Sequence, residues 1–123
     1  MTEDKDERRL LQIRSDAERI QSTIKAHGPD AFLEDPDVQD AIIMRLYRIS
    51  DLTSRLTDAL RARHSEINWR EIRGARNVMA HAYTNLELPT LWYIVEHDLP
   101  SLLTVVDAEL DRIRGRSDSE HSR

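Results

Sequence analysis

Residues 68–83 have the sequence Asn-Trp-Arg-Glu-Ile-Arg-Gly-Ala-Arg-Asn-Val-Met-Ala-His-Ala-Tyr. The stretch opens as a helix does, because Asn68 is a favoured N-cap and a glutamate three residues later can reach back to the N–H of the cap. Arg73, Asn77 and His81 follow at steps of four residues, which places their side chains on one helical face. The sequence therefore predicts a short third helix with a cationic, polar face.

Three further residues of this stretch bear on its chemistry. Arg76 lies beside the polar face, and its long side chain can swing onto it. Tyr83 would point away from His81 in a continuous helix, so it joins the group only if the helix ends near Ala82. Gly74 costs about 1 kcal/mol relative to alanine inside a helix. It is either a tolerated surface glycine or a place where another backbone or a substrate comes close, and we favour the second interpretation.

Apolar residues recur at three- and four-residue steps on both sides of the stretch, as they do in amphipathic helices. Four main helices are predicted in this way, over residues 3–27, 36–64, 68–82 and 89–113. A short turn of helix is expected within 30–35, and Pro100 should kink or divide the last helix. Three glycines and four prolines leave little room for the turns of an all-β fold. We predict an all-α, up-down four-helix bundle over residues 1–114 and a disordered tail over 115–123.

The bulk composition narrows the classes of function. The chain has 123 residues, a net charge of −5 and no cysteine, which excludes disulfides and thiolate metal sites. Its charged N-terminal residues lack the apolar segment of a signal peptide, and no window is long enough to span a membrane, so we expect a soluble cytoplasmic protein. Residues 45–83 hold eight arginines and four acids, a local charge of +4. This basic centre either binds a polyanion or consists of solvated arginines paired with neighbouring acids.

Several familiar kinds of site are missing from the sequence. The histidines lack the spacing or the cysteine neighbours of a metal site, no Ser-His-Asp triad can be placed, and no glycine-rich phosphate loop occurs. What remains is arginine and histidine on one short helix, a pairing that suits phosphodiester chemistry. The histidine can take the proton of an RNA 2′-OH or protonate the leaving 5′-oxygen, and the arginines can stabilise charge on the phosphate. One histidine cannot do both in one step, whereas two copies across a twofold interface could.

The residues from Arg76 to Tyr83 resemble the Arg-x4-His-x-Tyr signature of HEPN-domain proteins of the HepT type. Flanking motifs extend the resemblance, namely Ile67-Asn68-Trp69 before the signature and Leu91-Trp92 and Asp98-Leu99-Pro100 after it. The resemblance covers roughly residues 5–113 by helix order, although its specific motifs lie within 67–103. One departure is Ala82 between the histidine and the tyrosine, where many relatives have a polar residue.

The resemblance implies a homodimeric, metal-independent and cofactor-free ribonuclease that acts as the toxin of a type VII toxin–antitoxin system. It implies catalytic roles for Arg76 and His81, supporting or RNA-binding roles for Asn77 and Arg73, and AMPylation of Tyr83 by an MntA-like nucleotidyltransferase antitoxin. The expected product carries a 2′,3′-cyclic phosphate. Two alternatives stay open: a non-catalytic helical partner that docks onto a nucleotidyltransferase and presents its substrate, and a plain helical dimerisation domain.

Overall fold

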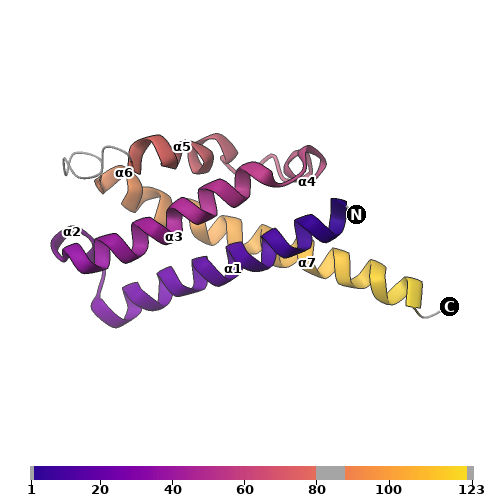
Figure 1. Ribbon diagram of the computed structural model, residues 1–123, viewed down its shortest axis with the longest axis horizontal. Coiled ribbons are helices and arrows are strands. Elements are labelled where there is room, and N and C mark those ends of the chain that lie inside the picture. The colour runs from indigo at the N-terminus through magenta and orange to yellow at the C-terminus, as the bar shows by residue number, and fades with distance from the viewer. Residues whose placement is uncertain (1, 80–87, 122–123) are drawn as a thin grey trace.

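The computed structural model describes residues 2–79 and 88–121, and the regular elements in these ranges are helices (Figure 1). They are α1 (Thr2–His27), α2 (Ala31–Glu34), α3 (Pro36–Arg55), α4 (Asp58–Arg63), α5 (Trp69–Met79), α6 (Leu88–Tyr93), the π-helical turn η2 (Ile94–Asp98) and α7 (Leu99–His121). The prediction of an all-α bundle is confirmed. Within the described ranges, no helix is both long enough and apolar enough to cross a membrane.

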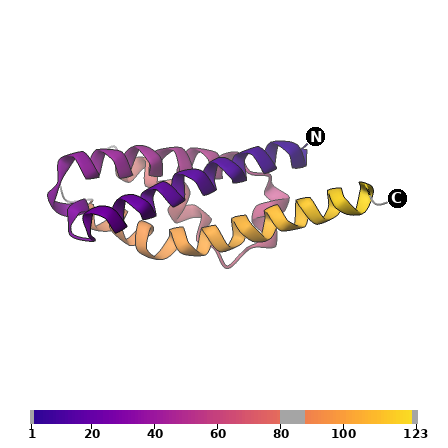
Figure 2. The same ribbon diagram turned by 90° about the horizontal axis from the view of Figure 1, so that it is seen from below.

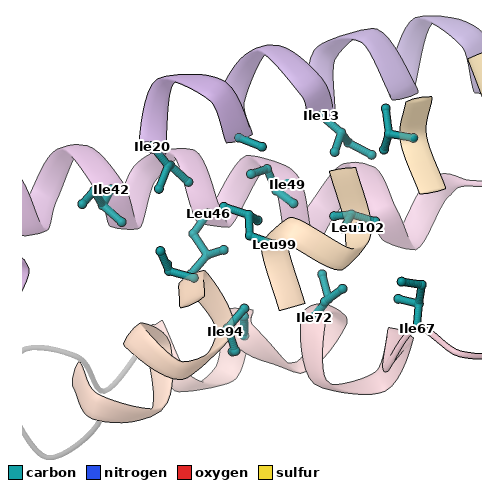
Figure 3. Close-up of a cluster of buried hydrophobic side chains, with 14 of the residues drawn as sticks. Ile13, Ile20, Ile42, Leu46, Ile49, Ile67, Ile72, Ile94, Leu99 and Leu102 are labelled. Atoms are coloured by element: carbon teal, nitrogen blue, oxygen red, sulfur yellow. The ribbon is translucent and has the colours of Figure 1, made fainter. Parts of the chain in front are cut away.

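The long helices α1 and α3 lie side by side, with α7 packed beneath them and α5 beside α3 (Figures 1 and 2). Aliphatic side chains from all four of these helices pack together between them and form the core (Figure 3). The labelled members of this core are Ile13, Ile20, Ile42, Leu46, Ile49, Ile67, Ile72, Ile94, Leu99 and Leu102. Each fully buried aliphatic side chain contributes about 1.5–3 kcal/mol relative to exposure, so this core holds α5 in a fixed place on α3.

The first connection is set by local chemistry. Gly28 adopts a left-handed φ of 88°, which a glycine tolerates without strain, and its N–H donates to the carbonyl of Ile24 at 2.7 Å. Pro36 then stands at the start of α3, where Asp35 accepts a hydrogen bond from the N–H of Asp37. Between them, α2 buries Phe32, whose ring stacks on Trp92 of α6 at 5.5 Å between centroids.

The prediction of one continuous helix over residues 36–64 is wrong. The chain breaks at Leu56 and Thr57, and α4 starts afresh because the hydroxyl of Thr57 accepts a hydrogen bond from the N–H of Leu60. The nearly buried carboxylate of Asp6, on α1, accepts bonds from the N–H of Thr57 at 3.1 Å and from its hydroxyl at 2.6 Å. A contact 51 residues away therefore stabilises the break.

The division expected around Pro100 takes the form of a change of helix type. The π-helical turn η2 precedes it, and the N–H of Leu99 donates to the carbonyl of Ile94, five residues back. Pro100, which has no N–H to donate, then stands second in α7, where a helix needs none. The last helix runs through Gly115 to His121, so residue 115 does not mark its end.

Candidate active site on α5

Asn68 caps the N-terminus of α5 as predicted, but Glu71 reaches the side chain of Asn68 rather than its backbone N–H. Oδ1 of Asn68 accepts a hydrogen bond from the N–H of Glu71 at 3.0 Å, and Nδ2 of Asn68 donates to the Glu71 carboxylate at 3.2 Å. Nε1 of Trp69 donates to the carbonyls of Arg61 and His64, which lie at the end of α4. These bonds satisfy groups that helix ends otherwise leave unpaired, and they join the start of α5 to the end of α4.

One side of α5 is held tightly against α3. Ile72, Ala75 and Met79 are buried, and the fully buried hydroxyl of Ser50 on α3 donates to the carbonyl of Arg73 at 3.1 Å. With this side fixed, the other side must face solvent. At Gly74, apart from its chain neighbours and the backbone of its own helix, no atom of the described chain lies within 4 Å of the place a Cβ would occupy. The close approach that we expected there is therefore not made by the described part of this chain.

Arg73, Arg76 and Asn77 are all exposed on α5, and Arg76 leans toward α3. Its guanidinium carbon lies 5.4 Å from the centre of the Tyr47 ring, and its Nη1 lies 3.6 Å from Oδ1 of Asp51. The other oxygen of Asp51 accepts from Nε of Arg55 at 3.2 Å. The Arg76 side chain remains 44% exposed, so its remaining N–H donors face solvent.

Sequence reasoning missed Tyr47 and Asp51 as parts of this site. The two residues are four apart on α3 and lie beside its apolar stripe, so helical spacing alone could have shown that they share a face. What spacing could not show is that α5 packs on that side of α3.

His81 and Tyr83 lie outside the described residues, so their predicted roles stay predictions. Within residues 2–79 and 88–121, no three histidine, aspartate or glutamate side chains are grouped to hold a metal ion.

A carboxyl pair connects η2 with the first turn of α5. Burial raises the pKa of Asp98 to about 7, and the neighbouring Glu71 adds to this by hydrogen bonding and by like-charge repulsion. Oδ2 of Asp98 is buried and has no hydrogen-bond partner in the described chain. Near neutral pH, this carboxyl is therefore poised between its two protonation states.

The pKa of Glu109, an acid on α7, is shifted in the opposite direction. Burial alone would raise the pKa of Glu109, but hydrogen bonds from Arg63, His64 and Arg112 outweigh it and lower the pKa to about 2. Glu109 is 3% exposed, and its oxygens lie 2.6 Å from Nη2 of Arg63 and 2.7 Å from Nε2 of His64. This cluster joins α4 to α7 as a structural ion network.

The fold and this site together define a small helical bundle that presents arginine side chains to solvent on a short, capped helix, a surface suited to phosphate groups. More specifically, the chain belongs to the ribonuclease HepT-like family, whose model matches residues 13–109. The predicted HepT-type resemblance is thereby confirmed.

Three curated relatives agree with this assignment. The chain is 35% identical over 71 residues to a protein of Thermococcus cleftensis named as a probable ribonuclease HepT, covering 58% of this chain and 64% of that one. It is 27% identical over 106 residues to a Methanocaldococcus jannaschii protein named as a gamma-glutamylcyclotransferase and candidate RNase, covering 84% of this chain and 48% of that one. It is 26% identical over 93 residues to a candidate RNase of Caldanaerobacter subterraneus subsp. tengcongensis, covering 76% of this chain and 83% of that one.

The chain thus spans less than two thirds of the first two relatives. No solved structure gives a significant match to it.

Proposed function

We propose that this chain is a metal-independent, cofactor-free endoribonuclease that acts in the cytoplasm as the toxin of a type VII toxin–antitoxin system. The observation that carries the proposal is the position of Arg76 on the exposed side of α5, held by Tyr47 and Asp51 in a chain of the ribonuclease HepT-like family. The relatives' names, which describe ribonucleases, support an RNA substrate.

The proposed reaction needs a base, an acid and a phosphate ligand. His81 of one protomer takes the proton of the RNA 2′-OH, and the 2′-oxygen attacks phosphorus while the bond to the 5′-oxygen breaks. His81 of the partner subunit protonates the leaving 5′-oxygen, and a 2′,3′-cyclic phosphate remains. Arg76 binds the phosphate oxygens as their charge grows, and Asn77 and Arg73 contact the strand beside it.

A homodimer is part of the proposal because a single chain supplies one histidine of this motif. Support comes from α3, where Met44 is 59% and Tyr47 is 43% exposed although both are large apolar side chains. Tyr47 also touches Arg76, so a partner that covers this side of α3 would lie next to the arginine. Covering such side chains is favourable by the usual hydrophobic term.

Control of the enzyme is proposed to act through Tyr83. An MntA-like nucleotidyltransferase would transfer AMP from ATP to its hydroxyl with release of pyrophosphate, adding bulk and negative charge close to the catalytic motif. An RNA phosphate would then be repelled and blocked. Co-expression with this antitoxin should add the mass of one or more AMP groups to the peptide that contains Tyr83.

The decisive experiment is cleavage of RNA by purified protein in the presence of a chelator. Arg76→Ala and His81→Ala should each lower the rate by about 10²–10⁴-fold, while Arg114→Ala, an exposed arginine on α7, should leave it unchanged. Circular dichroism should show the same helix content for all variants. If His81→Ala cut RNA as fast as the wild type, the catalytic assignment of His81 would be refuted. If the wild type cut no RNA and the chain expressed alone were harmless, the protein would instead be the non-catalytic partner of a nucleotidyltransferase.

A further inference from the structure

A polar cleft lies on the other side of α3 from α5, where α3 meets α1. Figures 1 and 2 both show these two helices side by side. The cleft has a volume of about 230 Å³ and is lined by Gln12, Ser15, Asp16, Arg19, Arg45 and Arg48. Every lining side chain is polar, and three of the six are arginines, which distinguishes the cleft from a gap in the apolar core.

Asp16 is the buried acid of the cleft, and it pairs with two of its arginines. It is 1% exposed, and its Oδ1 lies 3.2 Å from Nη1 of Arg45 and 3.4 Å from Nη2 of Arg48. Its other oxygen accepts a hydrogen bond from Nε2 of Gln12 at 3.3 Å. These contacts give the buried carboxylate the hydrogen-bond partners that it needs, and they hold both guanidinium groups in place. The remaining N–H donors of Arg45 and Arg48 do not point at this carboxylate.

The charges of the cleft do not balance. Three arginines face one carboxylate, which leaves an excess of two positive charges in a concave space. Arg19 is exposed, and its guanidinium has no hydrogen-bond or ion-pair partner in the described part of the chain. Like charges gathered in a cleft repel one another and concentrate anions there. All three cations are arginine, whose planar fork matches the oxygens of a phosphate.

We propose that this cleft binds phosphate groups of the RNA strand, as a second contact apart from the catalytic helix. This inference rests on the proposed function in that it takes RNA to be the substrate. An acidic protein surface is the less suitable ligand, because protein interfaces are anchored by buried aromatic or aliphatic side chains and this cleft is lined by none. Arg48 adjoins Tyr47 in the sequence, and Tyr47 contacts Arg76, so the cleft and Arg76 flank the same turn of α3.

The test measures binding of a labelled single-stranded RNA to the full-length chain by fluorescence anisotropy, over a range of salt concentrations. His81→Ala serves as the background, so that the RNA stays intact. Adding Arg19→Gln should weaken binding about three- to tenfold. The slope of log K against the logarithm of the salt concentration should become shallower by about 0.7 per lost phosphate contact. The double variant Arg19→Gln with Arg48→Gln keeps Asp16 paired with Arg45 but removes the excess positive charge of the cleft, so it should weaken binding further. Arg114→Gln is the matched control and should change neither quantity.

Unchanged affinity and salt slope in both cleft variants would overturn the proposal. It would also be overturned if these variants kept RNA affinity but lost binding to the co-expressed nucleotidyltransferase, because the cleft would then be a protein contact. Cleavage by the wild-type chain is scored separately. A chain that does not cut RNA, yet binds it more weakly after Arg19→Gln, would refute the proposed catalysis and uphold the cleft. A chain that cuts RNA while neither cleft variant changes RNA binding would uphold the proposed catalysis and refute the cleft.

Discussion

Arg76 combines a defined position with freedom to change partners. Its contact with Tyr47 is of a kind that contributes about 0.5–1 kcal/mol at exposed sites, and a surface ion pair such as that with Asp51 contributes about 0–1 kcal/mol. An RNA phosphate can therefore displace Asp51 at little cost while the tyrosine ring still guides the guanidinium. Arg55 holds the other oxygen of Asp51, so the displaced carboxylate would keep a cationic partner.

Asp98 makes stability depend on pH. Its folded-state pKa of about 7 lies above the ordinary value of 3.8, so the folded chain keeps a proton that the unfolded chain has lost. The free energy of unfolding should therefore fall as pH rises from about 4 to about 7, and then level off. Solvent screening of this partly exposed carboxyl limits the loss to about 1–2 kcal/mol. Asp98→Asn should be correspondingly more stable than the wild type at pH 8.

The measurement is urea unfolding of both proteins at intervals from pH 4 to pH 8, read as the difference between their stabilities. Groups that do not interact with Asp98 titrate alike in both chains and cancel in that difference, which therefore reports Asp98 together with its neighbour Glu71. Asp111→Asn, an exposed aspartate on α7, is the control and should track the wild type. A constant gap between wild type and Asp98→Asn across this range would contradict the raised pKa.

At the scale of helices, the sequence predicts best where the cause is local. Asn68 capping α5, Gly28 ending α1 and Pro36 starting α3 need only near neighbours, and all three predictions are confirmed. The break after Arg55 was missed because the apolar stripe passes through it unchanged. Its cause is the contact of Asp6 with Thr57, which exists only once α1 and α3 have packed.

The same division applies to the candidate site. Helical spacing predicts that Arg73 and Asn77 share one face of α5 with Arg76 beside it, and in the structure all three are exposed. The tyrosine and carboxylate that hold Arg76 come from α3, and the sequence carries no signal for which side of α3 receives α5. Tertiary packing decides that, through the buried contact between Ser50 and the backbone of α5.

The break between α3 and α4 should be sensitive to Asp6. Asp6→Ala leaves the N–H of Thr57 without its acceptor in a nearly buried position, which costs about 1–3 kcal/mol. Asp4→Ala removes an exposed carboxylate from the same helix and should change stability by less than about 0.5 kcal/mol. Thermal and urea unfolding of the two variants measure the difference. Equal stabilities would show that the break does not depend on α1.

For the whole molecule, the structure refines the meaning of the basic central region. Six of its eight arginines form ion pairs with acids: Arg45, Arg48, Arg55, Arg61, Arg63 and Arg76. Arg70 and Arg73, both exposed on α5, have no such partner in the described chain. Most of the local positive charge is therefore balanced within the fold. Within this region, the arginines without an acidic partner in the described chain lie on α5, and Arg19, from outside the region, adds another in the cleft beside α1.

The proposed dimer makes a prediction at this largest scale. Met44→Glu places a charge on the exposed apolar part of α3 without touching the core, so each chain should fold but dimers should dissociate. Light scattering should then report the mass of one chain, and RNA cleavage should fall with it although Arg76 and His81 are intact. Leu33→Glu, a similarly exposed apolar residue on α2, should remain dimeric and active. A Met44→Glu chain that is monomeric yet cuts RNA at the wild-type rate would refute a site shared between protomers, because one histidine would then suffice.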